Sequence, residues 1–318
     1  MGMEPCFRDR LTGRGPYTSA RKGAGTRISS QIVRESPPPV DLAALRSALF
    51  VPLADERFLA RAHERGADAL LLDLEDAVPP ALKATARARV GDAARRFAEL
   101  GLPVMLRVNS TAEHLAEDLA AAAAAPVSAV FLPKVESADH VAAAEFLLAG
   151  STARVVAMIE SPAAVLEAPA IARAGTRLAG LAFGSEDYCA QLGLASDRAA
   201  LDWPAQTVAT AARARGLAAF GQPGPVAEIA DMAAYGALLG RAKAMGFTGT
   251  LCIHPRQVAE SNRIYSPTAE ELALAREIVE ASDAALKEGR GAFQLRGRMI
   301  DPPVVEQARA TLARARRA

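Results

Sequence analysis

The sequence predicts an α/β protein whose main part is a (β/α)8 barrel, a TIM barrel, followed by a C-terminal helical extension. Eight apolar runs of strand length recur along the chain, at Ala48–Leu53, Ala69–Leu74, Pro103–Val108, Ala129–Pro133, Arg154–Ile159, Gly180–Gly184, Leu217–Phe220 and Thr250–Ile253. The segments between them, such as Glu56–Arg65 and Leu82–Leu100, are rich in alanine, arginine and glutamate at helical spacing. Continuous apolar strands that alternate with helices are typical of a parallel sheet covered on both faces. Eight such units favour a closed barrel.

An open doubly wound sheet that binds a dinucleotide is the main alternative fold. It requires a glycine-rich turn after the first strand, where the pyrophosphate meets a helix N-terminus. The residues at that place are Pro52-Leu53-Ala54-Asp55-Glu56, and the sequence has no Walker A motif. The barrel is therefore favoured, and we expect it over residues 41–266.

The N-terminal segment, residues 1–40, differs from the barrel. It combines seven basic residues with several glycines and the triplet Pro37-Pro38-Pro39, and it lacks periodic apolar positions. We expect a disordered extension, because such a composition cannot bury enough apolar surface to fold. An arginine- and serine-rich transit peptide is the alternative.

The C-terminal segment, residues 267–318, has a helical pattern of its own. Thr268 and Glu271 have the spacing of a capping box, which predicts a helix over Thr268–Glu288. A glycine-rich connection then leads to a terminal helix over Val304–Arg317. We expect this extension to buttress the barrel, to form a lid, or to reach into a neighbouring subunit as an oligomerisation element.

Composition excludes several classes of partner. The chain has 318 residues, is 51% hydrophobic, and carries a formal net charge of +1, which gives no case for nucleic acid or an acidic membrane as main partner. No stretch approaches the roughly 20 apolar residues that span a bilayer. The three cysteines form no CxxC pair, so a disulfide framework is not expected. A cytoplasmic protein is the natural expectation.

Polar or charged residues follow nearly every predicted strand. In a (β/α)8 barrel the carboxyl ends of the strands meet at one rim, and that rim carries the active site. The residues expected there are Asp73, Glu75, Asp76, Arg107, Asn109, Lys134, Glu136, Glu160, Glu186, Asp187, Gln222 and His254.

Glu160 and Asp187 are the best candidates for metal ligands. About one strand, one helix and two loops separate them, so a barrel would place both carboxylates on the same rim. Two carboxylates can hold one Mg²⁺ and leave open positions for water and substrate. The alternative is that each acid only stabilises the start of the helix that follows it.

Eight motifs in order resemble the citrate lyase beta-subunit family, which belongs to the HpcH/HpaI aldolase superfamily and includes malyl-CoA and citramalyl-CoA lyases. The resemblance covers roughly residues 45–310. The motifs are Arg46-Ser47-Ala48-Leu49-Phe50-Val51-Pro52, Asp73-Leu74-Glu75-Asp76-Ala77-Val78, Arg107-Val108-Asn109, Leu132-Pro133-Lys134, Ile159-Glu160-Ser161-Pro162, Phe183-Gly184-Ser185-Glu186-Asp187-Tyr188, Ile253-His254-Pro255 and Gly297-Arg298-Met299-Ile300-Asp301.

This resemblance implies a homo-oligomeric enzyme, a trimer or hexamer, that cleaves or forms a carbon–carbon bond beside a CoA thioester. The implied substrate is a 3-hydroxy-dicarboxyl-CoA of the malyl or citramalyl type, with an acyl-CoA and a 2-oxo acid as small-molecule partners. The implied metal is Mg²⁺, with Mn²⁺ as the alternative, held by Glu160 and Asp187. Hydrolysis of the thioester is a related outcome.

The resemblance also implies roles for single residues. Arg107 and Asp301 are the implied catalytic residues: Arg107 stabilises the enolate and, with Glu160, contacts the small acid, while Asp301 moves a proton in the site of a neighbouring subunit. The further residues implied in substrate binding are Phe50, Arg57, Arg61, Ile253 and His254. The acids implied to support the site from outside the metal and substrate contacts are Asp73, Glu75 and Asp76.

Several alternatives stay open at this level. Arg107 could be a structural ion-pair partner of Asp73 or Glu75, His254 could fix a loop by a hydrogen bond, and Arg57 and Arg61 could belong to a solvated helix face. A CoA-independent class II aldolase acting on a 2-keto-3-deoxy acid and a non-catalytic barrel subunit are the rival functions.

Two residues depart from the family pattern. Leu53 stands where the family usually has glycine, and it is expected to narrow or redirect the thioester channel. Gln222 stands about where many members carry an acidic residue, which is expected to change the acyl group or the hydrolytic step.

Overall fold

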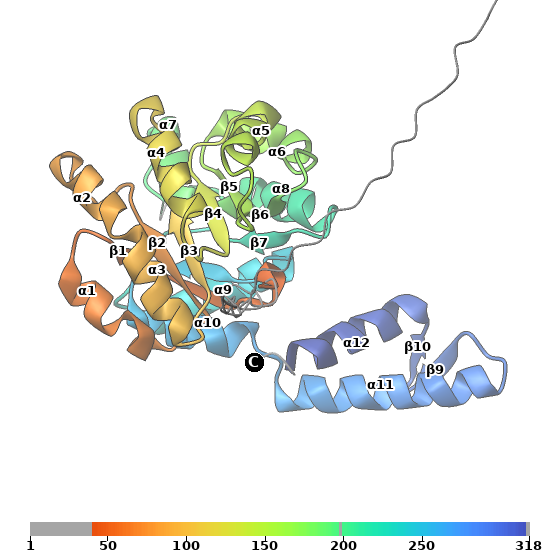
Figure 1. Cartoon of the computed structure of the whole chain (residues 1–318). Coiled ribbons are helices and arrows are strands. Elements are labelled where there is room, and N and C mark those ends of the chain that lie inside the picture. Colours follow the sequence, from red (N-terminus) through yellow and green to blue (C-terminus); the bar gives the residue numbers. More distant parts are fainter. Residues whose placement is uncertain (1–39, 197–198, 316–318) are drawn as a thin grey trace, which may run out of the picture. The chain divides into compact units, whose positions relative to one another are not determined.

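A computed structural model describes residues 40–196 and 199–315, so the expected disorder of residues 1–40 falls almost entirely outside the described residues. Eight strands form one parallel sheet in the order β7-β6-β5-β4-β3-β2-β1-β8 (Figure 1). Their bounds are β1 Ser47–Pro52, β2 Ala69–Asp73, β3 Val104–Arg107, β4 Ala129–Leu132, β5 Arg154–Ile159, β6 Leu178–Phe183, β7 Ala218–Phe220 and β8 Thr250–Cys252.

The sheet nearly closes on itself. β1 pairs with both β2 and β8, and a single parallel bridge between Phe220 and Gly249 joins the two edges of the sheet. A Cβ on Gly249 would lie 2.2 Å from the carbonyl oxygen of Leu45, so the chain needs glycine at this point of closure. The predicted (β/α)8 barrel is confirmed.

Both faces of the strands are buried, which explains their continuous apolar sequences. Leu71 packs inside the barrel with Phe131 and Phe220, whose ring centroids lie 5.8 Å apart. Its neighbours Leu70 and Leu72 belong to a second cluster, between the strands and the helices. The alternation follows from the two-residue period of a strand. Because both faces of the strands are buried and all eight strands are parallel, the polar residues at their carboxyl ends are the ones that reach the rim.

The helices of the barrel alternate with the strands around the sheet (Figure 1). Their bounds are α1 Glu56–Arg61, α2 Lys83–Ala88, α3 Val90–Glu99, α4 Ala112–Ala123, α5 Ala138–Leu147, α6 Pro162–Ile171, α7 Ser185–Leu192, α8 Asp202–Arg213, α9 Met232–Met245 and α10 Pro255–Tyr265.

Two of the expected helices are not continuous. The helix predicted over Glu56–Arg65 changes after α1 into a 3₁₀ turn, Ala62–Arg65, which ends at Gly66 with a left-handed φ of 72°. The helix predicted over Leu82–Leu100 is divided into α2 and α3 at Arg89, whose guanidinium donates to the carbonyl oxygen of Leu53 at 3.1 Å.

The C-terminal extension contains α11 (Ala269–Lys287), a hairpin of β9 (Phe293–Leu295) and β10 (Arg298–Ile300), and α12 (Pro302–Ala315). The capping box at the start of α11 is confirmed, since Glu271 N donates to Thr268 Oγ1 at 3.1 Å and Thr268 N donates to Glu271 Oε2 at 2.9 Å. The division between barrel and extension at residues 266 and 267 stays a prediction.

The hairpin was missed by the sequence prediction, which had only a glycine-rich connection there. Its two turn residues, Arg296 and Gly297, both have a left-handed φ, of 50° and 76°. Paired positive φ values are the geometry of a two-residue turn that suits twisted strands. The hairpin closes a small core in which Ile300 packs with Ile278 and Val305. None of the helices described is long and apolar enough to cross a membrane.

Candidate active site

Arg107 and Asp73 form the central ion pair of the rim. They end adjacent strands and are paired in register, β2 with β3. Arg107 Nε and Nη2 donate to the two Asp73 carboxylate oxygens, each at 2.7 Å, and the arginine is only 8% exposed. This fork is the geometry that arginine offers and lysine does not. Burial alone would lower the pKa of Arg107, but the hydrogen bonds and charge of Asp73 outweigh it and raise that pKa.

Two further acids and an aromatic ring complete the surroundings of Arg107. Its Nη1 lies 3.1 Å from Glu75 Oε2 and 3.1 Å from Asp76 Oδ2. The Phe50 ring centroid lies 4.7 Å from the guanidinium carbon, a cation–π contact. The three acids expected around the site therefore all contact Arg107. The structural ion pair considered above is present, and the guanidinium also lines a cavity.

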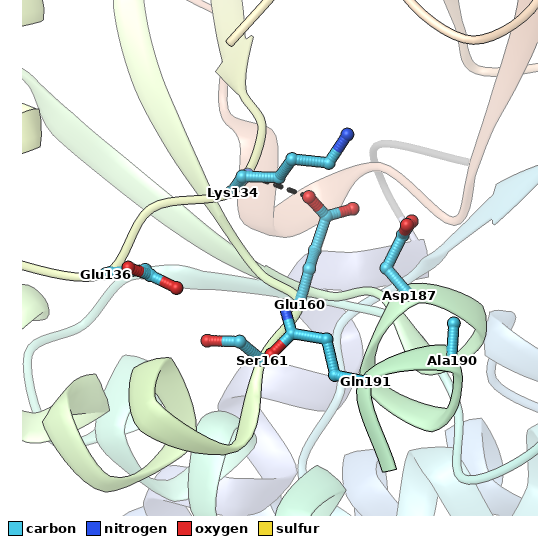
Figure 2. Close-up of a pocket in the computed structure, with 7 residues that line it drawn as sticks. All are labelled: Lys134, Glu136, Glu160, Ser161, Asp187, Ala190 and Gln191. Carbon is cyan, nitrogen blue, oxygen red and sulfur yellow. Dashed lines mark hydrogen bonds between the residues drawn. The ribbon is translucent and has the colours of Figure 1, made fainter. Parts of the chain in front are cut away.

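Glu160 follows β5 and is 3% exposed. Its Oε2 accepts a hydrogen bond of 2.8 Å from the backbone N–H of Lys134, which follows β4 (Figure 2). On the other side, a Cβ on Gly184 would lie 2.7 Å from both Cγ and Oε1 of Glu160. Burial, with the negative charges of Asp187 and Glu75, raises the pKa of Glu160 to about 7 although the Lys134 N–H opposes the shift.

Asp187 lies in the first turn of α7, and its carboxylate points to the same side as that of Glu160 (Figure 2). Within the described residues it has no hydrogen bond or ion pair of its own. The preceding acid, Glu186, is engaged elsewhere, because its Oε1 accepts from Val226 N at 3.0 Å. The two neighbouring acids thus have different tasks, and Asp187 is the one available as a ligand.

Glu160 and Asp187 line two cavities. The smaller, of about 270 Å³, is lined mainly by charged and polar residues: Lys134, Glu136, Glu160, Ser161, Asp187, Ala190 and Gln191 (Figure 2). The larger, of about 520 Å³, contains Arg107, Asp73 and Asp76 beside apolar side chains that include Phe50, Phe58, Met158, Phe183 and Ile253. The two carboxylates therefore line both the smaller cavity, with its charged side chains, and the larger, more apolar cavity.

The donor set suits a hard divalent cation. No group of three or more potential His, Cys, Asp or Glu ligands occurs in the part of the chain described, so the protein offers two carboxylates. Mg²⁺ is commonly held by one or two carboxylates and completes its octahedron with water and substrate oxygens. Burial, and after it the negative charge of Asp187, raise the pKa of Glu160, and a cation held between the two carboxylates would oppose that shift.

The other residues expected in substrate binding lie in different places. Ile253 lines the larger cavity, whereas His254 begins α10, where its Nδ1 accepts from Arg256 N at 3.2 Å. Arg57 and Arg61 are exposed on α1 and pair with Asp55 and Glu64. These contacts agree with the structural alternatives, in which His254 fixes a loop and the two arginines belong to a solvated helix face. A role in substrate binding stays a prediction for His254, Arg57 and Arg61.

Asp301 precedes α12 in the extension, and its carbonyl oxygen accepts from the backbone N–H groups of Val304 and Val305 at 3.1 Å. It lines neither of the two cavities that contain Glu160. A catalytic role for Asp301 in the site of a neighbouring subunit therefore stays a prediction.

The two departures from the family pattern have different outcomes. Leu53 is 0% exposed, belongs to the core between strands and helices and lines neither cavity beside Glu160; its expected effect of narrowing or redirecting the thioester channel stays a prediction. Gln222 lines the larger cavity, where its Oε1 accepts from Thr250 Oγ1 at 2.7 Å and its Nε2 donates to Pro225 O at 3.0 Å.

Three residues of the site were missed or given no role by the sequence prediction. Phe58 lies on α1 between the two exposed arginines and is 58% exposed, but it lines the larger cavity. Lys83 Nζ donates to the carbonyl oxygens of Leu74 and Glu75 at 2.8 and 2.6 Å and so holds the loop after β2. The sequence prediction placed Lys134 on the rim but gave it no function. The only sequence signal for a functional role of Lys134 is its charge directly after a strand.

The fold and this rim define a (β/α)8 barrel with two carboxylates at its carboxyl rim that suit a divalent cation. A family model described as HpcH/HpaI aldolase/citrate lyase matches residues 46–255, and the chain belongs to that family. This confirms the predicted family and the predicted enzyme class, a lyase.

Characterised relatives span nearly the same length. The citrate lyase subunit beta of Escherichia coli K12 is 35% identical over 283 residues, which cover 85% of this chain and 93% of the relative. A (3S)-malyl-CoA thioesterase of Cereibacter sphaeroides is 33% identical over 277 residues, covering 85% of this chain and 94% of the relative.

Solved structures share this fold, and some of them contain bound ligands. The CitE protein of Mycobacterium tuberculosis in complex with magnesium, acetoacetate and coenzyme A is 34% identical, with a TM-score of 0.68 over 86% of this chain and 99% of that one. A citrate lyase beta subunit from M. tuberculosis complexed with oxaloacetate and magnesium is 32% identical, with a TM-score of 0.59 over 72% of this chain and 100% of that one. Magnesium and a CoA ligand, the groups expected for this chain, thus occur in its solved relatives.

Proposed function

We propose that this protein is a Mg²⁺-dependent carbon–carbon lyase that cleaves or forms a 3-hydroxy-dicarboxyl-CoA of the malyl or citramalyl type. The observation that carries the proposal is the placement of Glu160 and Asp187 in the same two cavities, the larger of which Arg107 also lines. The named activities of the relatives and the CoA and oxo-acid ligands of the solved structures support the substrate class.

In this proposal each residue of the site has a separate role. Glu160 and Asp187 hold Mg²⁺, which when bound polarises the carbonyl of a 2-oxo acid as a Lewis acid. Arg107, kept in place by Asp73, presents a fixed positive charge to the oxygen of the thioester enolate as the carbon–carbon bond breaks or forms. Phe50 and Ile253 provide apolar walls of the larger cavity for the acyl part of the substrate.

Asp301 lines neither of the two cavities that contain Glu160, and we propose that it acts in the site of a neighbouring subunit. There it would move the proton between the enolate or alcohol and solvent, as a carboxylate in a closed site can do. This arrangement requires a homo-oligomer, which we propose to be a trimer or hexamer. In a hydrolytic variant, a water held near Asp301 or Glu75 would attack the thioester.

The direct test is turnover. Purified protein with Mg²⁺ is incubated with malyl-CoA, methylmalyl-CoA and citramalyl-CoA, and cleavage, condensation and free CoA are each followed. At least one activity is expected, with loss on chelation of the metal. Absence of all activities across the set would overturn the substrate class.

A CoA-independent aldolase is the second candidate, and the pairing of Arg57 with Asp55 and of Arg61 with Glu64 favours it. Both arginines are exposed, and their charges are already balanced on the helix surface. The double variant Arg57→Glu, Arg61→Glu separates the two functions. A CoA enzyme should lose apparent affinity for its thioester, whereas an aldolase acting on a 2-keto-3-deoxy acid should be unaffected.

A further inference from the structure

Arg107 is surrounded by carboxylates, so beyond its proposed contact with the enolate oxygen it has little positive charge left for the carboxylate of a small acid. Its Nε and both of its terminal nitrogens lie within 3.1 Å of carboxylate oxygens of Asp73, Glu75 and Asp76. Three acids surround this one guanidinium, and the nearby Lys83 ammonium donates to the carbonyl oxygens of Leu74 and Glu75 and lines neither of the two cavities. A 2-oxo acid brings a further carboxylate, so another cation beside the metal is required.

Lys134 is the cation that remains available. Within the described residues its ammonium has one ion-pair partner, Glu75 Oε1 at 3.1 Å, and its side chain is 46% exposed. An ammonium group has three N–H donors, so two are left for another acceptor. Lys134 lines the smaller cavity, and its amine reaches the side toward which Glu160 and Asp187 point (Figure 2).

The backbone of Lys134 is strained in the way that a functional position often is. Among the described residues other than glycine, only Lys134 and Arg296 have a left-handed φ, and that of Lys134 is 54°. Arg296 lies in a hairpin turn, which explains its conformation. Lys134 lies at a strand end, and its conformation accompanies the N–H donated to Glu160. One residue therefore holds the metal carboxylate and carries the ammonium beside it.

The smaller cavity has the chemistry of a carboxylate site once a metal is bound. Its charged residues are Lys134, Glu136, Glu160 and Asp187. Two of the three acids are the metal ligands, so the cation charge cancels them. Ser161 also lines the cavity and caps α6 through Ala164 N at 3.0 Å, so the positive end of that helix lies at the same place.

We propose that the Lys134 ammonium binds the carboxylate of the small 2-oxo acid in the smaller cavity, while the Lys134 N–H keeps Glu160 positioned for the metal. The assignment rests on the proposed function for the identity of the acid. It makes Lys134, which has no role in the sequence prediction, a substrate-binding residue.

The test separates substrate binding from metal binding. Lys134→Met keeps the length of the side chain and the backbone N–H but removes the charge, Lys134→Arg restores a charge, and Lys287→Met removes an exposed charge from α11 as the matched control. Calorimetric titrations measure Mg²⁺ binding to the apo protein and pyruvate binding to the Mg²⁺-loaded protein, and thermal unfolding is measured for each variant.

Lys134→Met should weaken pyruvate binding about 10-fold or more, since a charge-assisted hydrogen bond is lost. Its Mg²⁺ affinity should be equal or higher, because a positive charge near the metal carboxylates is gone. Lys134→Arg should recover pyruvate binding in part, and Lys287→Met should match the wild type. The melting temperature should be unchanged in all of them.

Unchanged pyruvate binding in Lys134→Met would overturn the assignment. A parallel loss of Mg²⁺ affinity and melting temperature in Lys134→Met would also overturn it, because it would indicate a structural role. A wild-type protein that binds Mg²⁺ but no pyruvate would overturn it as well. A wild type that binds both ligands but turns over none of the CoA thioesters would overturn the proposed function and leave the Lys134 assignment intact.

Discussion

The guanidinium of Arg107 and the carboxylate of Asp73 are joined by two hydrogen bonds of 2.7 Å each, across two strands that pair in register. This fork leaves the arginine little freedom. A charge held in this way can stabilise an enolate oxygen without reorganisation, which is the condition for strong electrostatic stabilisation.

Arg107→Lys should therefore lower kcat by about 10²-fold or more, because an ammonium cannot reproduce the bidentate contact with Asp73. Steady-state kinetics with the active thioester and Mg²⁺ binding by calorimetry provide the measurement. Mg²⁺ affinity should change little. A kcat near that of the wild type would assign Arg107 to structure alone.

The pKa of Glu160, about 7, predicts how pH affects the metal-free protein. A carboxyl group whose folded pKa lies above its unfolded value binds more protons when folded, so stability falls as pH rises from about 4.5 to about 7. The cost above pH 7 is on the order of 3–4 kcal/mol, at roughly 1.4 kcal/mol per pKa unit.

Thermal unfolding in the presence of a chelator, from pH 5 to pH 8, checks this expectation. Mg²⁺ should raise the melting temperature more at pH 8 than at pH 5, because protons and the cation compete for the same oxygens. Glu160→Gln should abolish the Mg²⁺ effect and flatten the pH dependence. An equal Mg²⁺ effect at both pH values would contradict the raised pKa.

Gly184→Ala should weaken Mg²⁺ binding about 10-fold without unfolding the protein. The added Cβ would meet Glu160 Cγ and Oε1 at 2.7 Å and push the carboxylate out of place. Gly240→Ala is the control, because a Cβ there has open space within α9. It should leave Mg²⁺ affinity unchanged and raise stability by about 0.5–1 kcal/mol. Equal Mg²⁺ affinity in both variants would show that Glu160 tolerates displacement.

Asp301→Asn should lower kcat strongly while the melting temperature stays unchanged, since the residue is at a helix start and outside the core. Mixing it with Arg107→Lys after subunit exchange tests where it acts. If Asp301 completes the site of another subunit, some sites in the mixed oligomer contain both native residues, and activity reappears. No recovery in a demonstrably mixed oligomer would place Asp301 in its own subunit or in no site.

Much of the fold followed from local pattern. The eight predicted strands agree with the observed ones to within about two residues, because each is a continuous apolar run buried on both faces. The capping box at Thr268 was also predictable, since its two hydrogen bonds join residues three apart. The break at Arg89 was not, because it depends on a hydrogen bond to Leu53, which is remote in the sequence.

The sequence by itself determined that charged groups gather at one rim, because parallel strands that alternate with helices end on the same side. It also singled out Glu160, Asp187 and Arg107. The tertiary structure alone decided how each group is used: Glu186 contacts Val226, leaving Asp187 free, and Leu53 is buried away from the cavities. Lys134 has a left-handed backbone that brings its N–H to Glu160. These outcomes depend on side-chain directions and on contacts between distant segments, which no local sequence pattern records.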